Sequence, residues 1–199
     1  MKEVVLASRN DGKLAEMQAL LAPLGWKLRL VSDFSDETPA ETASTFIENA
    51  LIKARHAAQV SGLPAIADDS GLEVDALGGA PGVYSARYAG EGASDAQNNQ
   101  KLLQVLKNVA DNARTARFVC VMAYLRSAAD PTPIIAQGQW RGSILHNPRG
   151  HNGFGYDPLF YVAEQKCSSA ELEPAVKNKI SHRARAAKHL YSALHDGHA

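Results

Sequence analysis

The sequence has little cysteine, no excess of charge of either sign and no long hydrophobic run. Its two cysteines, Cys120 and Cys167, lie far apart and form no CxxC pattern. No disulfide framework is therefore predicted, and this usage is typical of a reducing compartment such as the cytoplasm. The 21 basic residues balance the 21 acidic residues, so no net charge favours nucleic acid or an anionic membrane.

The apolar run at residues 4–7 is followed directly by polar residues, and it is too short for a signal segment or a membrane span. We therefore expect no membrane association. The chain has 199 residues, 45% of them hydrophobic, and shows no internal repeat or flexible linker. These features predict a compact globular protein in which residues 1–199 form one domain or two closely joined lobes. A basic cluster near the C-terminus, which includes Lys177 and Arg183, lacks interleaved aromatic residues and is read as a solvated face rather than a nucleic-acid site.

Polar residues join a short predicted strand, 3–8, to a helix that begins at Asn10. The helix has apolar residues at helical spacing and ends at Gly25. The joining loop is Ser8, Arg9, Asn10, Asp11, Gly12 and Lys13. Backbone N–H groups at a helix start favour phosphate. A lysine there is unfavourable unless an anion lies nearby. The alternative is an ordinary helix cap with a solvated lysine.

A second polar signal is the pair Asp68 and Asp69, which follows an apolar stretch. We expect a strand that ends at these carboxylates, a turn at Ser70 and Gly71, and a second strand. Adjacent carboxylates repel each other, and a divalent cation such as Mg²⁺ would remove that cost. The alternative is a hairpin turn with no ligand, since Asp, Ser and Gly are common in turns.

Helix signals recur along the chain. Thr45 and Glu48 form a capping-box pattern that begins a helix ending at Gly62. Its predicted core positions are Ile47, Leu51, Ala54 and Ala58. Asn49 is read as solvated, and Lys53 lies within reach of a phosphate. A further helix is predicted over 95–109, and Ser181 caps a C-terminal helix with Ala184, Ala187, Leu190 and Leu194 facing inward.

Strands are predicted over 114–127 and 134–145 and are expected to pair as a hairpin. The glycine-rich segment that follows, 147–157, contains Phe154. An aromatic ring between glycines can stack on a planar base, a contact that contributes about 1 to 3 kcal/mol. The alternative is that Phe154 fills the core.

These signals occur together in five motifs. They are SxNxGK at 8–13, ETxxTFxENAxxKA at 41–54, DDSGLxVDxLGGxPGxYSARY at 68–88, GFGYDP at 153–158 and SHR at 181–183. In this order they span nearly the whole chain, and the sequence resembles the inosine triphosphate pyrophosphatases. The resemblance implies an elongated α/β fold in which a long twisted mixed β-sheet flanked by helices forms two lobes around a nucleotide cleft.

The resemblance also implies an activity and partners. Members of this family use Mg²⁺ to hydrolyse inosine, deoxyinosine and xanthosine triphosphates to the monophosphate and pyrophosphate. They thereby clear damaged purines from the nucleotide pool, and they form homodimers. A pyrophosphatase for modified pyrimidine nucleotides and a nucleotide-binding regulatory module are the alternatives. The paired carboxylates disfavour the regulatory module.

The family's residue roles are carried over motif by motif. The resemblance implies that Asp69 is the general base and a metal ligand and that Asp68 supports it. Ala40 stands where relatives have an acidic residue that is often assigned to the metal, so either Glu41 takes its place or Asp68 and water complete the metal site. The implied substrate-binding residues are Ser8, Arg9, Asn10, Asp11, Gly12, Lys13, Lys53, Ser70, Phe154, Gly155, Tyr156, Asp157, Lys177, His182 and Arg183.

Overall fold

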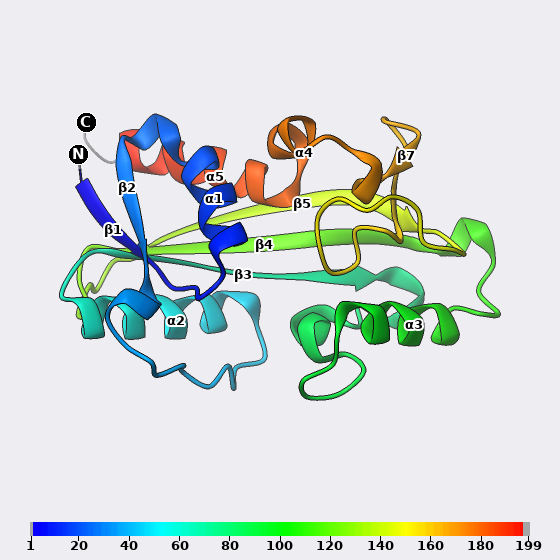
Figure 1. Ribbon diagram of the computed structural model, residues 1–199, viewed down its shortest axis with the longest axis horizontal. Coiled ribbons are helices and arrows are strands. Elements are labelled where there is room, and N and C mark those ends of the chain that lie inside the picture. Colours follow the sequence, from blue (N-terminus) through cyan, green and yellow to red (C-terminus); the bar gives the residue numbers. More distant parts are fainter. Residues whose placement is uncertain (1, 197–199) are drawn as a thin grey trace. The chain divides into compact units, whose positions relative to one another are not determined.

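The computed structural model describes residues 2–196 and contains a seven-stranded mixed sheet with helices on its faces (Figure 1). The strand order is β2-β1-β3-β4-β5-β6-β7. The strands are β1 (Lys2–Leu6), β2 (Trp26–Leu30), β3 (Ala65–Val74), β4 (Thr115–Leu125), β5 (Ile134–Ile144), β6 (Phe160–Val162) and β7 (Cys167–Ser168). The α-helices are α1 (Asp11–Leu20), α2 (Phe46–Ser61), α3 (Asp95–Val105), α4 (Pro174–Ile180) and α5 (His182–Asp196).

The chain divides into two compact units. Unit 1 comprises residues up to 69 together with 120–138 and the segment from 183 onward, and unit 2 comprises 70–119 and 139–182. The single domain that the sequence favours stays a prediction. Within residues 2–196, no helix is both apolar enough and long enough to cross a bilayer.

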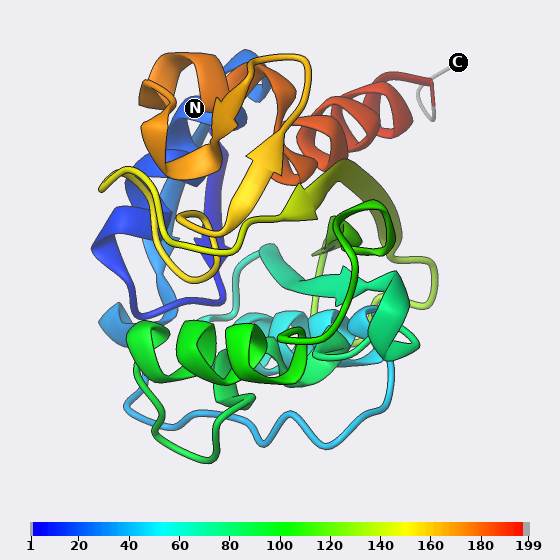
Figure 2. The same ribbon diagram turned by 90° about the vertical axis from the view of Figure 1, so that its right-hand side faces the viewer.

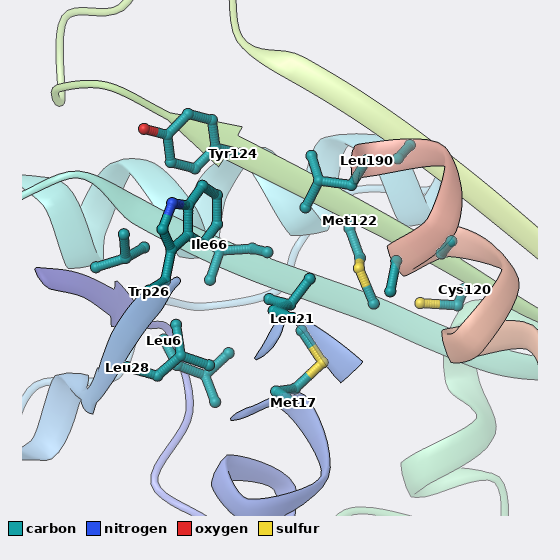
Figure 3. Packing of buried hydrophobic residues seen from close by; sticks show 14 of the residues in the cluster. Leu6, Met17, Leu21, Trp26, Leu28, Ile66, Cys120, Met122, Tyr124 and Leu190 are labelled. Carbon is teal, nitrogen blue, oxygen red and sulfur yellow. The ribbon is translucent and has the colours of Figure 1, made fainter. Parts of the chain in front are cut away.

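Unit 1 is built on β1, which pairs in parallel with both β2 and β3. Successive side chains of a strand point to opposite faces. Val4 and Leu6 accordingly pack with α1 and α5, whereas Val5 packs with α2. Figure 3 shows the first of these clusters, in which Met17 and Leu190 approach the strands from two helices. The two faces of the sheet in unit 1 are therefore covered by different helices.

The start of α1 agrees with the prediction. The side-chain Oδ1 of Asn10 accepts a hydrogen bond of 3.0 Å from the backbone N–H of Lys13, which places Lys13 in the first turn. The helix ends earlier than predicted, at Leu20, and a 3-10 turn with Pro23 near its start leads to Gly25. Proline has no N–H to continue an α-helical ladder, and Gly25 adopts a left-handed φ of 64°.

Helix α2 begins after Thr45 and ends before Gly62, as predicted. Its buried stripe differs in part from the prediction. Ala54 and Ala58 are buried as predicted, but in the first turns Phe46 and Ala50 are buried, whereas Ile47 is 36% exposed. Asn49 is fully buried rather than solvated, because its side chain exchanges hydrogen bonds with the backbone of Ala43. The buried stripe is rich in alanine, which allows the helix to approach the sheet closely. Helical periodicity alone did not distinguish this stripe from the adjacent one that contains Ile47 and Leu51.

The cap of α2 provides a test of this local structure. We expect Thr45→Ala to lower the free energy of unfolding by about 1 kcal/mol. The Thr45 Oγ1 accepts the backbone N–H of Glu48 at 3.2 Å and donates to the Glu48 carboxylate at 2.7 Å. Urea titration measures the change. Thr45→Ser, which keeps the hydroxyl, should retain most of the stability, and equal losses in both variants would contradict the capping role.

Strand β3 is continuous from Ala65 to Val74, so the predicted turn at Ser70 and Gly71 is wrong. Figure 1 shows β3 as one long arrow. β3 has strand neighbours on both sides, β1 and β4. Pairing of this kind outweighs the local preference of Ser and Gly for turns. Asp68 and Asp69 therefore lie in the interior of a strand.

Unit 2 has its own core, to which α3, β6 and the parts of β3, β4 and β5 that belong to this unit contribute. Strands β4 and β5 are neighbours, which confirms the predicted pairing. Helix α3 is shorter than predicted, but Leu102 and Leu106 are buried as expected. The sequence reading missed α4, β6 and β7, which are too short to show a period. In α5, which lies mainly in unit 1, Ala186 rather than Ala184 is buried.

Candidate active site

The two carboxylates of β3 have separate surroundings. Neighbouring residues of a strand point to opposite faces. Asp68 is on the face that α1 and α5 cover, and Asp69 is on the face that α2 covers. Both are buried, with 1% and 7% of their surface exposed. A buried carboxylate needs an ionic or hydrogen-bonding partner. Asp68 pairs with two cationic side chains on its face of the strand, and Asp69 pairs with one on the other face.

Asp68 is held by two cations of unit 1. Lys13 Nζ lies 2.6 Å from Oδ1, and Arg183 Nε donates to Oδ2 at 3.1 Å. Arg183 also lies 3.7 Å from the carboxylate of Glu16. Burial opposes ionisation of Asp68, but the charges of Lys13, Arg183 and Lys53 hold its pKa well below the usual range. The anion that compensates the lysine at the start of α1 is therefore a protein carboxylate.

Asp69 shares a cation with a second carboxylate. Lys53 Nζ of α2 donates to Asp69 Oδ1 at 2.6 Å and lies 3.2 Å from Glu41 Oε1. Burial raises the pKa of Asp69 and outweighs the opposing effect of Lys53, while Glu41 and Asp68 add to the increase. Burial disfavours the charge of Lys53, but the three carboxylates raise its pKa overall. Asp69 is thus a more basic carboxylate than an ordinary aspartate.

The donor set of this group suits a hard divalent cation in part. Glu41 and Asp69 converge on one cationic position, which Lys53 Nζ occupies. Two carboxylates, with water and phosphate oxygens, form a set that Mg²⁺ accepts. Asp68 lies on the opposite face of β3. Among residues 2–196, no group of three or more acidic, histidine or cysteine side chains is placed to hold a metal.

The 8–13 loop is tied down by its own side chains. Ser8 Oγ accepts the backbone N–H of Asn10 at 3.2 Å. Arg9 reaches away from the helix, where its guanidinium bonds Asp36 and Thr38 at 3.0 Å each. Asp11 is exposed in the first turn of α1, and a Cβ at Gly12 would meet Asn10 Oδ1 at 3.1 Å. Ser70 follows Asp69 directly in β3.

Several predicted site residues lie in unit 2, on or next to residues 147–158, which we call the aromatic loop. Phe154 is 52% exposed, so the alternative that it fills the core is wrong. Lys177 Nζ lies 5.5 Å from the Phe154 ring centre and donates to Asp157 Oδ2. Asp157 also accepts a hydrogen bond from Ser169. Lys177 is 9% exposed and Arg183 is buried as well, so the predicted solvated basic face is wrong for these two residues. The other members of that cluster, Lys179, Arg185 and Lys188, are exposed.

Two other predicted residues are internal to unit 2. Tyr156 is 4% exposed and its hydroxyl donates to the carbonyl oxygen of Ser85 at 2.8 Å. Burial raises the pKa of this hydroxyl, and the nearby charges of Tyr88 and Asp95 add to the effect. His182 is also buried and stacks on Phe118 with ring centres 4.8 Å apart. Tyr156 and His182 are therefore held inside unit 2.

Sequence reasoning missed Glu16, Asp95 and Asn99. Glu16 lies one helical turn after Lys13, and this spacing was the only available signal for it. Asp95 accepts the backbone N–H of Gly155 at 2.6 Å, and Asn99 donates to the Gly155 carbonyl at 2.8 Å. Asp95 is the first residue of α3 and follows Ser94, which forms a capping box with Gln97. A pattern of this kind indicates where a helix begins, but it does not indicate a contact with the aromatic loop.

Comparison with known proteins identifies the family of this chain. The model of the Ham1 family matches residues 4–193. The chain belongs to the Ham1 family. It is 57% identical over 98% of both chains to a protein of Vibrio cholerae named dITP/XTP pyrophosphatase, and 60% identical to one of Pseudomonas syringae with the same name, over 94% of this chain and 93% of that one.

Solved Ham1 structures have the same fold. A HAM1 protein from Coxiella burnetii matches with a TM-score of 0.90 and 52% identity, covering 98% of this chain and 100% of that one. The Ham1 protein of Staphylococcus aureus matches with a TM-score of 0.86 and 41% identity, with each chain fully covered. The predicted mixed sheet flanked by helices is confirmed.

Proposed function

We propose that this Ham1-family protein hydrolyses inosine, deoxyinosine and xanthosine triphosphates to the monophosphate and pyrophosphate, and so removes damaged purines from the nucleotide pool. The relatives from Vibrio cholerae and Pseudomonas syringae, both named dITP/XTP pyrophosphatase, support this substrate class. The observation that carries the chemistry is the buried carboxylate of Asp69, whose pKa is raised and which Lys53 holds at 2.6 Å. A positioned base of this kind is what attack by water requires.

In the proposed reaction, Asp69 accepts a proton from a water molecule. The water oxygen forms a bond to the α-phosphorus, the bond to the bridging oxygen breaks, and pyrophosphate leaves with that oxygen. Lys53 fixes the orientation of the Asp69 carboxylate. Asp69 and Glu41 would hold Mg²⁺, which when bound supplies positive charge against the phosphate oxygens. Asp68 supports the site by fixing Lys13 and Arg183.

The remaining roles are assigned in the same proposal. Backbone and side-chain donors of the 8–13 loop, with Lys53 and Ser70, bind phosphate groups. In unit 2 the purine base stacks on Phe154, and Gly155, Tyr156, Asp157 and Lys177 form its surroundings. Donors of His182 and Arg183 recognise the 6-oxo group, since a 6-amino group would leave them unpaired and desolvated.

The proposed stacking role of Phe154 gives a prediction. Phe154→Ala should raise KM for deoxyinosine triphosphate by roughly 5- to 150-fold, which corresponds to the 1 to 3 kcal/mol of a base–aromatic stack. Inhibition by pyrophosphate, which has no base, should change little. Steady-state kinetics measures both quantities. Tyr84→Ala removes another exposed aromatic ring of unit 2 and serves as the control. Equal losses for the nucleotide and for pyrophosphate would contradict the assignment.

The proposed function is tested by incubating the protein with Mg²⁺ and a panel of purine and pyrimidine triphosphates. The products are then identified as pyrophosphate or single phosphate. We expect pyrophosphate from the 6-oxo purine substrates and much slower turnover of adenosine and pyrimidine triphosphates. Preference for a modified pyrimidine would favour the alternative pyrophosphatase. Binding without hydrolysis would favour a regulatory module.

The proposal includes a homodimer that acts in the cytoplasm and binds neither nucleic acid nor membrane. Both cysteines are free thiols, in β4 and β7, which is consistent with a reducing compartment. Light scattering coupled to gel filtration measures the mass of the particle in solution. A mass of one chain at micromolar concentration would remove the dimer from the proposal.

A further inference from the structure

Helix α3 holds the peptide that follows Phe154. Asp95 is the first residue of α3, and Asn99 is one turn later on the same side of the helix. Gly155 donates its N–H to Asp95 Oδ2 at 2.6 Å and accepts a hydrogen bond from Asn99 Nδ2 at 2.8 Å. One face of one helix thus satisfies both backbone groups of a single loop residue. Figure 2 shows α3 in green beside the yellow aromatic loop.

A second restraint acts on Phe154 itself. Its backbone N–H donates to Asp157 Oδ2 at 2.9 Å, and the same oxygen accepts from Lys177. Gly153 packs so closely here that a Cβ would come within 2.0 Å of Asp157 Oδ2. The backbone on each side of Phe154 is therefore held by a carboxylate. Hydrogen bonds to an ionised acceptor are among the stronger ones in proteins.

Side-chain packing anchors the aromatic loop at Tyr156, which lies in the core of unit 2, but it does not bury Phe154. A pocket of about 470 Å³ borders the aromatic loop, and its lining includes Asp95, Asn99 and Gln100 of α3 together with Phe154 and Gly155. The ring of Phe154 is half exposed. A ring that is half exposed beside a pocket is held less tightly by packing than a buried ring, so the hydrogen bonds to the backbone on each side of Phe154 contribute to its orientation.

We propose that Asp95 and Asn99 are positioning residues that fix the ring of Phe154 in the orientation that stacks on the purine base. The inference rests on the proposed function and extends it to two residues of α3. They act through Gly155 and do not touch the base. Losing either contact lets the loop move toward the pocket, and part of the binding energy is then used to order it again.

The decisive experiment is a double-mutant cycle between Asp95→Ala and Phe154→Ala, with deoxyinosine triphosphate as substrate. Asp95→Ala alone should raise KM by about tenfold, as expected for a lost charge-assisted hydrogen bond, and should change kcat by less than about twofold. In the Phe154→Ala background the same change should raise KM by less than about twofold, because the ring it positions is gone. An equal rise in both backgrounds, or no rise, would overturn the inference.

Two further variants separate positioning from helix stability. Asn99→Ala removes the second contact and leaves the charge at the start of α3 in place, so a similar rise in KM is expected. Gln100→Ala is the matched control, since Gln100 lines the same pocket but, within the described chain, makes no hydrogen bond to the loop. Its KM should stay at the wild-type value. A rise in Gln100→Ala equal to that in Asn99→Ala would overturn the positioning role.

Hydrogen exchange gives a readout that needs no catalysis. Amides of residues 150–158 should exchange faster in Asp95→Ala and Asn99→Ala than in wild type and Gln100→Ala, and unchanged exchange would overturn the restraint. A wild-type protein that hydrolyses no purine triphosphate would overturn the proposed function together with the role in base binding. Normal hydrolysis by wild type with an unchanged KM in Asp95→Ala would overturn this inference alone.

Discussion

Asp69→Asn is expected to lower turnover by about 100- to 10,000-fold, the range typical of a lost general base. The amide that replaces the carboxylate has almost the same shape and retains an oxygen toward Lys53, but it cannot accept the proton of the attacking water. Glu41 remains 3.2 Å from Lys53 Nζ, so the lysine keeps a charged partner. Single-turnover assays on purified protein measure the loss.

The fold should tolerate this change. Burial raises the pKa of Asp69, so its ionised form costs stability in the folded state. A group with a raised pKa contributes stability at acidic pH, and that contribution is lost as the pH rises through the folded-state value. The charge of Asp69 also stabilises the protonated Lys53, but Glu41 remains as a partner of that lysine, so at neutral pH Asp69→Asn should unfold at a urea concentration close to that of wild type. Asp33→Asn, at an exposed ion pair, is the kinetic control. Near-normal turnover in Asp69→Asn would refute the base assignment.

Asp68→Asn is expected to show the opposite pattern, a large loss of stability. Lys13 and Arg183 would then face a neutral amide, and removing one partner of a buried ion pair typically costs about 3–5 kcal/mol. We expect a loss at the lower end, about 3 kcal/mol, because Glu16 still lies near Arg183. Urea titration at pH 7 measures the free energy of unfolding. A loss below about 1 kcal/mol would show that the buried pairs contribute little.

The pH dependence supplies a check on the same residue. The pKa of Asp68 is lowered despite its burial, because Lys13, Arg183 and Lys53 favour the charged form. Its contribution is therefore fully present above the unfolded-state pKa of about 3.9 and is lost as the pH falls below it. The difference in stability between wild type and Asp68→Asn should shrink in that acidic range. An acid-independent difference would contradict the ionic origin.

Local signals in the sequence predicted local structure well. The capping residues Asn10 and Thr45 fixed two helix starts, because a cap satisfies backbone groups within three residues of itself. In α2 the last two predicted core positions were correct, but the first two were one position off, since alanine carries little hydropathic contrast. The turn at Ser70 and Gly71 was wrong because strand pairing, which involves distant residues, decided the outcome.

The cationic partners of Asp68 and Asp69 could not be predicted from the sequence for a related reason. Arg183 lies 115 residues from Asp68 in the chain, and no periodicity reports a contact of that range. The motifs placed Asp68 and Asp69 in one metal site, but they could not show that successive residues of a strand would be divided between two helical layers. Likewise, the link from Asp95 to Gly155 depends on a tertiary contact between a helix start and a loop 60 residues later.

The division of Asp68 and Asp69 between the two faces of β3 has a consequence for how this protein can change in length. Deleting or inserting one residue in the strand, for example at Ala67, would turn every later side chain to the other face. The Asp68 carboxylate would then face the side of Lys53 instead of the side of Lys13 and Arg183. The Asp69 carboxylate would likewise turn to the opposite face. Length variation among natural sequences and in engineered libraries should therefore be confined to the loops, and β3 should keep its ten residues.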